Sequence, residues 1–128
     1  MARKKLELSA AEWDIMNTVW MHPEAVTVRD VMDAAYPNDE KAYTTVQTLM
    51  NILVEKGVLR RKKAGMVIKY TPAVLRDAVL DASMNTVARR MFSGSFGAMA
   101  SFLVSSNNLS DDDIAALRRL LDEKEREL

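Results

Sequence analysis

Apolar residues recur with a helical period over three segments in the first part of the sequence. The first segment runs from about Ala10 to Met21, and His22-Pro23 ends it because a residue before proline avoids the helical region. A second, short helix is predicted to end near Tyr36-Pro37, and a third runs from Ala42 to Lys56 with Gly57 as its stop. The buried face predicted for the third helix comprises Val46, Leu49, Met50, Leu53 and Val54.

Three helix starts carry the same capping sequence. In Ser9-Ala10-Ala11-Glu12, the serine hydroxyl can accept a hydrogen bond from the glutamate N–H, and the glutamate side chain can accept one from the serine N–H. Thr27 to Asp30 and Ser110 to Asp113 repeat this pattern, each flanked by an apolar pair that can pack across the cap. These motifs predict the starts of the first, second and last helices, the last extending to about Glu125.

After Gly57 the period changes from helical to alternating. Val58–Lys63 and Met66–Thr71 flank Ala64-Gly65, which predicts a β-hairpin closed off by Pro72. Three short helices followed by a hairpin is the order of a winged helix-turn-helix. The sequence therefore predicts a mainly α protein with a winged helix-turn-helix domain over residues 1–72, followed by a helical region over residues 73–128.

The helical region is predicted to hold two copies of the chain together. Four apolar residues of its first helix have the 4-3-4 spacing of a seam that can pack against a partner helix. Three helices of about 50 residues in total have too little core of their own, so we expect a homodimer; the alternative is that they fold back on the winged domain. The predicted interface residues are Leu80, Met84, Val87, Met91, Phe96, Phe102, Leu117 and Leu121.

Composition narrows the classes of function. Among the 128 residues there is no cysteine and one histidine, so disulfides, thiolate metal sites and thiol nucleophiles are excluded. The four glycines do not cluster as a phosphate loop, and no nucleophile–base set is evident. We therefore expect neither an enzyme nor a metal or cofactor. No apolar run approaches the length of a membrane span, and the cytosol is the expected location.

Charge is segregated along the chain although the net charge is zero. Residues 6–40 carry eight acids and one base, whereas residues 41–72 carry seven bases and one acid. A solvated run of charge is one explanation. However, the bases fall at the end of the third helix and in the hairpin, the recognition helix and wing of a winged helix, which favours double-stranded DNA as the partner.

Individual side chains of this region suit DNA. The amides of Gln47 and Asn51 lie one helical turn apart, and an amide can pair with adenine in the major groove. Tyr43 and Thr44, at the start of the third helix, are further candidates for DNA contacts. The alternative for Tyr43 is packing against the second helix, and the alternative for Thr44 is capping of the third helix. Bases that alternate along the hairpin suit phosphate contacts, and at most two of the four consecutive ones can share a face. The predicted DNA-binding residues are Arg29, Tyr43, Thr44, Thr45, Gln47, Thr48, Asn51, Arg60, Arg61, Lys62, Lys63 and Lys69.

Five runs in residues 6–72 carry a family resemblance: Leu8–Met16, Thr27–Val31, Ala42–Thr48, Leu53–Leu59 and Tyr70–Pro72. They resemble the penicillinase-repressor family of bacterial transcriptional regulators, the BlaI, MecI and CopY type. The resemblance implies a sequence-specific repressor that binds a palindromic operator as a homodimer. It also implies derepression by a regulatory protease, triggered by a membrane sensor of β-lactams. The alternatives are a winged-helix protein-interaction module and a ligand-responsive regulator without a proteolytic switch.

The sequence departs from the family pattern at three points. Ile52 and Met66 stand where many members have arginine, which removes two DNA contacts. Members linked to β-lactams are cut between asparagine and phenylalanine, and the equivalent bond here joins Ser101 and Phe102, our candidate cleavage site. Copper-responsive members have a C-terminal cysteine cluster, so the lack of cysteine excludes copper sensing of that kind.

Overall fold

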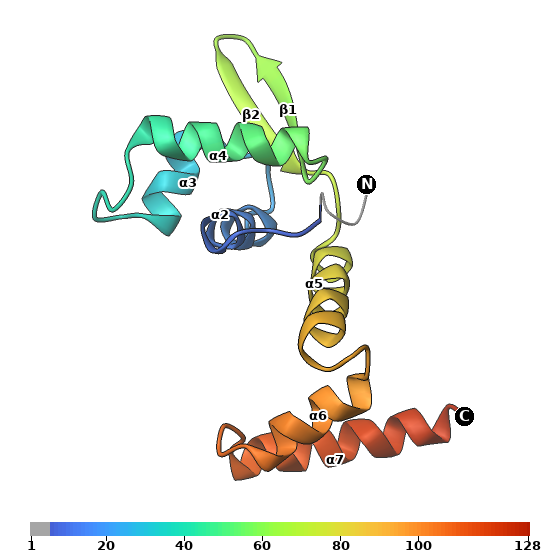
Figure 1. Ribbon diagram of the computed structural model, residues 1–128. Helices are drawn as coiled ribbons and strands as arrows, with labels where there is room; N and C mark the ends of the chain where they lie inside the picture. The colour runs from blue at the N-terminus through green and yellow to red at the C-terminus, as the bar shows by residue number, and fades with distance from the viewer. Residues whose placement is uncertain (1–5) are drawn as a thin grey trace. The chain divides into compact units, whose positions relative to one another are not determined.

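The computed structural model describes residues 6–128, which divide into two compact units that meet between Met84 and Asn85. The N-terminal unit (residues 6–84) holds the winged helix, and the C-terminal unit (residues 85–128) is helical (Figure 1). The elements in chain order are α2 (Ala10–Met21), α3 (Val28–Ala35), α4 (Tyr43–Glu55), β1 (Leu59–Ala64), β2 (Val67–Pro72), α5 (Arg76–Met91), α6 (Phe96–Ser105) and α7 (Asp111–Arg126). Three helices followed by a two-stranded hairpin confirm the predicted winged helix-turn-helix.

The three predicted capping boxes are present. At the start of α2, the Glu12 N–H donates to Ser9 Oγ over 3.2 Å, and the Ser9 N–H donates to Glu12 Oε1 over 2.8 Å. Thr27 and Asp30 make the same pair of bonds at α3, as do Ser110 and Asp113 at α7. Each box satisfies backbone N–H groups that a helix start leaves without partners, which explains why these helices begin where the sequence predicts.

The core of the N-terminal unit lies between its helices and the base of the hairpin. Helix α4 contributes Val46, Met50 and Leu53, each fully buried, and the hairpin contributes Leu59 and Tyr70. Burial of a side chain of this size stabilises a fold by about 1.5–3 kcal/mol. Because its buried residues lie on one face, α4 presents the opposite face to solvent.

The segment after the hairpin stays attached to this unit. The Ala73 N–H donates to the Val58 carbonyl over 2.8 Å, and the Trp20 indole N–H donates to the Val74 carbonyl over 3.1 Å. The first turns of α5 accordingly belong to the N-terminal unit. The predicted boundary at residue 72 marks the end of the hairpin, whereas the two compact units meet within α5.

The turn of the hairpin lies one residue later than predicted. Ala64 pairs with Val67 across the antiparallel strands, so the two turn residues are Gly65 and Met66 rather than Ala64 and Gly65. Gly65 has a φ of 65°, which places the glycine first in the turn, where a residue must adopt positive φ. Met66 is consequently at the tip of the hairpin and is 95% exposed.

A partly buried ion pair that the sequence did not predict joins α2 to the end of α4. Lys56 Nζ lies 2.7 Å from Glu12 Oε1 and also donates to the Glu7 carbonyl over 3.1 Å. Burial alone would raise the pKa of the Glu12 carboxyl. The hydrogen bonds from Lys56 and Ser9, together with the charge of Lys56, outweigh burial and lower this pKa below its ordinary value of 4.5. Lys56 therefore ties the end of α4 to α2 and to the chain before it.

The C-terminal unit has little core of its own. Helices α6 and α7 lie side by side (Figure 1) and form an apolar groove of about 200 Å³. Within the described ranges of these two helices, no residue is buried. The ring centroids of Phe92 and Phe102 are 6.0 Å apart, yet Phe102 is still 60% exposed. One copy of this unit therefore leaves many of its apolar side chains exposed to water.

We predict that Glu12→Gln destabilises the protein by about 1–3 kcal/mol at pH 7, because the variant loses a charge-assisted hydrogen bond to Lys56. A lowered pKa in the folded state means that the carboxylate stabilises the fold above pH 4.5 and ceases to do so as the pH falls through the folded value. Urea unfolding at pH 7 and pH 3 should show the difference from wild type shrinking in acid. Glu55→Gln, at an exposed position beside Lys56, is the control. An equal difference at both pH values would contradict the ion-pair explanation.

Candidate nucleic-acid interface

The polar face of α4 carries short hydroxyls and the amides of Gln47 and Asn51. Thr44, Thr45 and Thr48 are exposed and Gln47 is half-buried, and all four lie away from the buried residues of this helix. We call these four residues the reading face. They are the side chains on α4 that the sequence analysis predicted to contact DNA, apart from Tyr43 and Asn51.

The start of α4 differs from the starts of the helices that have a side-chain cap. Its N-cap is Ala42, so α4 has no side-chain cap, whereas α2, α3, α6 and α7 in the described chain all have one. Thr44 does not cap the helix. First-turn N–H groups without a side-chain acceptor suit an anion, and the helix dipole adds to this preference.

Arg29 and Tyr43 lie together beside this helix start. The guanidinium carbon of Arg29 is 5.5 Å from the centre of the Tyr43 ring, within cation–π range. Tyr43 is 42% exposed, so it both packs against α3 and faces solvent. The ring therefore holds one of the predicted DNA-binding bases close to the uncapped start of α4.

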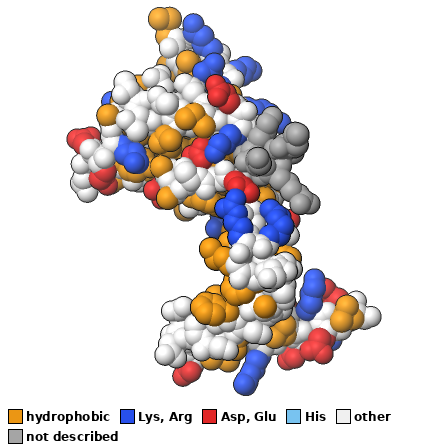
Figure 2. Space-filling view, viewed as in Figure 1, with side chains coloured by type: hydrophobic (Ala, Val, Ile, Leu, Met, Phe, Trp, Pro, Cys, Tyr) orange, Lys and Arg blue, Asp and Glu red, His pale blue; other side chains and the backbone are white. Residues whose placement is uncertain are grey.

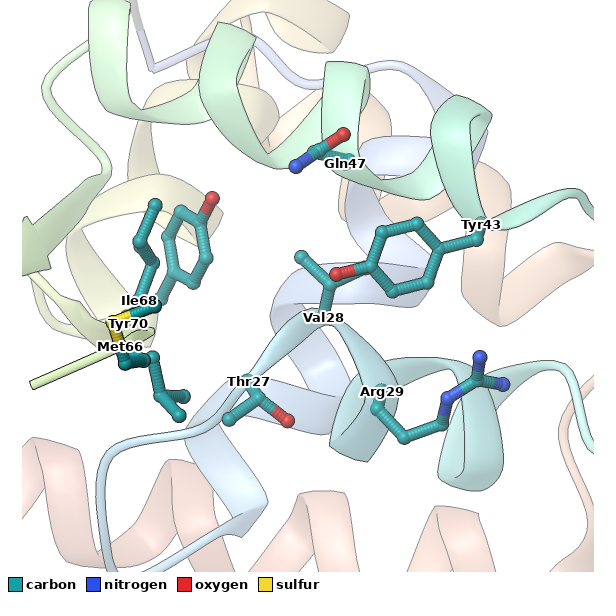
Figure 3. Close-up of a pocket in the computed structure, with 9 residues that line it drawn as sticks. Thr27, Val28, Arg29, Tyr43, Gln47, Met66, Ile68 and Tyr70 are labelled. Carbon is teal, nitrogen blue, oxygen red and sulfur yellow. The ribbon is translucent and has the colours of Figure 1, made fainter. Parts of the chain in front are cut away.

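An open pocket of about 370 Å³ separates the helices from the hairpin. Figure 3 shows Tyr43 and Gln47 of α4 facing Ile68 and Tyr70 of β2 across it, with Thr27 and Arg29 at the start of α3. The walls thus come from three elements that are far apart in the sequence. A concave, mixed polar and apolar surface between a helix and a hairpin can receive a nucleic-acid backbone.

The hairpin carries five bases and no acid over residues 59–72. Residues directly opposite in an antiparallel pair point to the same face, so Lys62 and Lys69 share one face and Arg61 and Tyr70 share the other. Arg60 and Lys62 are therefore on one side and Arg61 and Lys63 on the opposite side, as the alternation predicted. Figure 2 shows Lys and Arg side chains along the hairpin and apolar side chains at its tip. The five exposed bases are Arg60, Arg61, Lys62, Lys63 and Lys69.

Asn51 is a predicted DNA-binding residue whose side chain makes two hydrogen bonds within the protein. Its Oδ1 accepts hydrogen bonds from the Arg61 guanidinium and from the Tyr70 hydroxyl, each over 3.0 Å. Burial raises the pKa of the Tyr70 hydroxyl although the nearby Arg61 opposes the shift, so this group is protonated at neutral pH and donates. No sequence signal pointed to this contact, because its three members come from α4 and both strands.

The predicted dimer-interface residues lie on α5, α6 and α7. Met91, Phe102 and Leu121 are 72%, 60% and 61% exposed. Met84, Phe96 and Leu117 are also exposed, while Leu80 and Val87 are half-buried. Ser101 and Phe102, the candidate cleavage residues, lie inside α6 and are both exposed.

Residues 6–128 contain no group of three or more His, Cys, Asp or Glu residues arranged to hold a metal ion. They also contain no helix with the length and apolarity needed to cross a bilayer.

The fold and its basic hairpin define a winged-helix protein. Residues 8–123 match the sequence model of the family described as penicillinase repressor, and the chain belongs to this family. The methicillin resistance regulatory protein MecI of Staphylococcus aureus (strain N315) is 27% identical over 124 residues, which cover 97% of this chain and 100% of that protein. The penicillinase repressor of Bacillus licheniformis is 25% identical over 121 residues, covering 94% of each chain.

A solved structure also aligns with part of the chain. It is the solution structure of the monomeric form of Bacillus licheniformis BlaI in complex with the blaP half-operator. The two chains are 28% identical with a TM-score of 0.48, and the alignment covers 56% of this chain and 85% of that chain.

Proposed function

We propose that this protein is a transcriptional repressor that binds a palindromic DNA operator as a homodimer in the cytoplasm. One observation carries the proposal: the same unit contains a hairpin with five exposed bases and no acid, and a helix, α4, with a polar face and no side-chain cap at its start. The names of its relatives, penicillinase repressor and methicillin resistance regulatory protein, support the same function.

The two parts of this surface have different tasks in the proposal. The reading face enters the major groove, where Gln47 can accept and donate hydrogen bonds at a base edge. The bases of the hairpin, together with Arg29, neutralise phosphates, which adds affinity without much sequence information. Many members of the family have arginine at the positions of Ile52 and Met66, so this chain lacks two candidate DNA contacts, and we expect its operator to differ from theirs.

We predict that Gln47→Ala changes which bases are tolerated at one operator position, whereas Lys62→Ala weakens binding to all sequences. A lost base contact costs about 1–3 kcal/mol of discrimination. A lost phosphate contact reduces the slope of log affinity against log salt by about 0.9. Selection from a random DNA pool measures the first effect, and a salt titration of operator binding measures the second.

Lys124→Ala is the matched control for the lysine variant, because Lys124 is an exposed lysine of α7, outside the proposed DNA surface. It should leave both the selected sequence and the salt slope unchanged. Absence of salt-dependent DNA binding by the wild-type protein would overturn the proposed function and favour a winged-helix module that binds protein.

The C-terminal unit is the proposed dimerisation region. Its apolar side chains are exposed over all three helices, and α6 and α7 contain no buried residue within their described ranges. A unit of 44 residues with so little core is not expected to be stable alone. A second copy would cover these side chains and bring two winged helices onto two half-sites of the operator.

We predict that Met91→Asp produces monomers that bind the full operator poorly, because it places a charge in the proposed seam. Met21→Asp is the matched control: Met21 is 84% exposed and Met91 72%, but Met21 lies on α2 of the N-terminal unit. Sedimentation measures the oligomeric state of both variants. If the Met91 variant still sediments as a dimer while the wild type is dimeric, the seam along α5 is wrong and α7 becomes the candidate.

The proposed route of derepression is cleavage between Ser101 and Phe102 by a regulatory protease. Both residues are exposed but helical, so α6 must open locally before a protease can bind them in extended form. Gly97 is the second residue of α6, and a glycine in a helix costs up to about 1 kcal/mol relative to alanine, which makes opening of this end of the helix easier. Cleavage would separate α7 from α5 and weaken the dimer.

We predict that β-lactam treatment of the native cells yields a fragment of about 101 residues, and that Gly97→Ala slows its appearance by up to about fivefold. The substitution stabilises α6 by at most about 1 kcal/mol, because Gly97 lies in the first turn of the helix. It also fits, because an alanine Cβ there would lie 3.7 Å from Ser95 Oγ, an ordinary contact. Immunoblots over time measure the fragment. An intact repressor together with induced target genes would exclude the proteolytic route and favour a ligand.

A further inference from the structure

The side-chain oxygen of Asn51 joins α4 to both strands of the hairpin. It accepts one hydrogen bond from Arg61 on β1 and one from Tyr70 on β2, and these two residues are direct partners across the hairpin. An amide oxygen has two lone pairs, so both are in use. We call the three side chains the bracket.

Tyr70 is also fixed at its backbone. Its N–H donates to the Val26 carbonyl over 2.7 Å, and its carbonyl accepts from the Val26 N–H over 2.9 Å. Tyr70 is 1% exposed. It therefore links the chain before α3, the hairpin and, through its hydroxyl, α4.

We propose that Asn51 is a positioning residue that sets the angle between the hairpin and α4 and does not read a base. Bidentate pairing of an amide with adenine needs its oxygen as an acceptor, and that oxygen is occupied by the bracket. This inference rests on the proposed binding to DNA, and it assigns Asn51 a different task from Gln47.

The hairpin needs such a fixation. A two-stranded hairpin is marginally stable by itself, and beyond its base every residue from Arg60 to Lys69 is exposed. With the bracket broken, the outer part of the hairpin is anchored only through the Val26 bridge and the buried base. Its five bases then occupy a wider range of positions relative to the reading face, and fewer of them meet a phosphate at once.

The test uses Tyr70→Phe and Asn51→Ala in the full-length chain. Because Tyr70 is buried, its hydroxyl cannot contact DNA, so its loss affects DNA binding through the position of the hairpin. Each variant should bind operator about three- to tenfold more weakly, with a shallower salt slope and an unchanged sequence preference in the random pool. The double variant should bind no more weakly than Asn51→Ala, since both changes remove the same link.

Tyr36→Phe is the matched control. It also deletes a buried tyrosine hydroxyl from the N-terminal unit, but this hydroxyl has no hydrogen-bond partner among residues 6–128. It should leave affinity and salt slope unchanged. A changed base preference in Asn51→Ala with none in Tyr70→Phe would overturn the inference and return Asn51 to the reading set.

Urea unfolding of the two single variants and the double variant tests the bracket without DNA. If the loss of unfolding free energy in the double variant is smaller than the sum of the losses in the two single variants, Asn51 and Tyr70 are coupled in the folded protein. Additive energies would overturn the bracket even if the wild type binds operator. Coupled energies in a protein that binds no DNA would instead overturn the proposed function.

Discussion

The one-sided burial of α4 is the constraint on which the N-terminal unit depends. Val46, Met50 and Leu53 are each fully buried against α2, α3 and the hairpin base, so the rotation of α4 about its axis is fixed. The same rotation decides which side chains are exposed, and it leaves Gln47 and three threonines outward. The Glu12–Lys56 ion pair then ties the far end of α4 to α2. The polar surface is thus a consequence of packing on the opposite face.

In the C-terminal unit, by contrast, a single copy does not bury the apolar side chains of its helices. Phe102, Val104 and Leu121 are each about 60% exposed in a single chain. Exposed apolar surface of this extent is typical of a protein–protein interface. The N-terminal unit supplies its own core, whereas the C-terminal unit leaves apolar side chains exposed that a second copy would cover in the proposed repressor.

Local patterns were predicted from the sequence and distant contacts were not. Capping boxes and the glycine stop at residue 57 act within four residues, so spacing alone located the helix ends. The ion pair between Glu12 and Lys56 joins positions 44 residues apart. Nothing in the sequence distinguishes Lys56 from the other six bases of residues 41–72 as the partner of Glu12. Asn51 had a polar, helical position suited to base reading, but its contacts depend on where the hairpin lies. The predicted hairpin turn was one residue too early, because the sequence does not decide whether Ala64 or Met66 joins Gly65 in a two-residue turn.

Zero net charge has a consequence for how tightly one copy can hold DNA. The five bases of the hairpin attract phosphates, but residues 6–40 carry an excess of seven acids in the same unit. At physiological salt, charges further apart than about 8 Å are largely screened, so the bases act only on phosphates that they nearly touch. A single unit therefore has little long-range attraction to DNA, and its five hairpin bases add affinity only through phosphates that they contact closely. Stable occupancy in the proposed repressor must come from two units bound to one operator, where the second binds at a high effective concentration. A repressor of this kind is released by any event that separates its two copies, even when each winged helix remains intact.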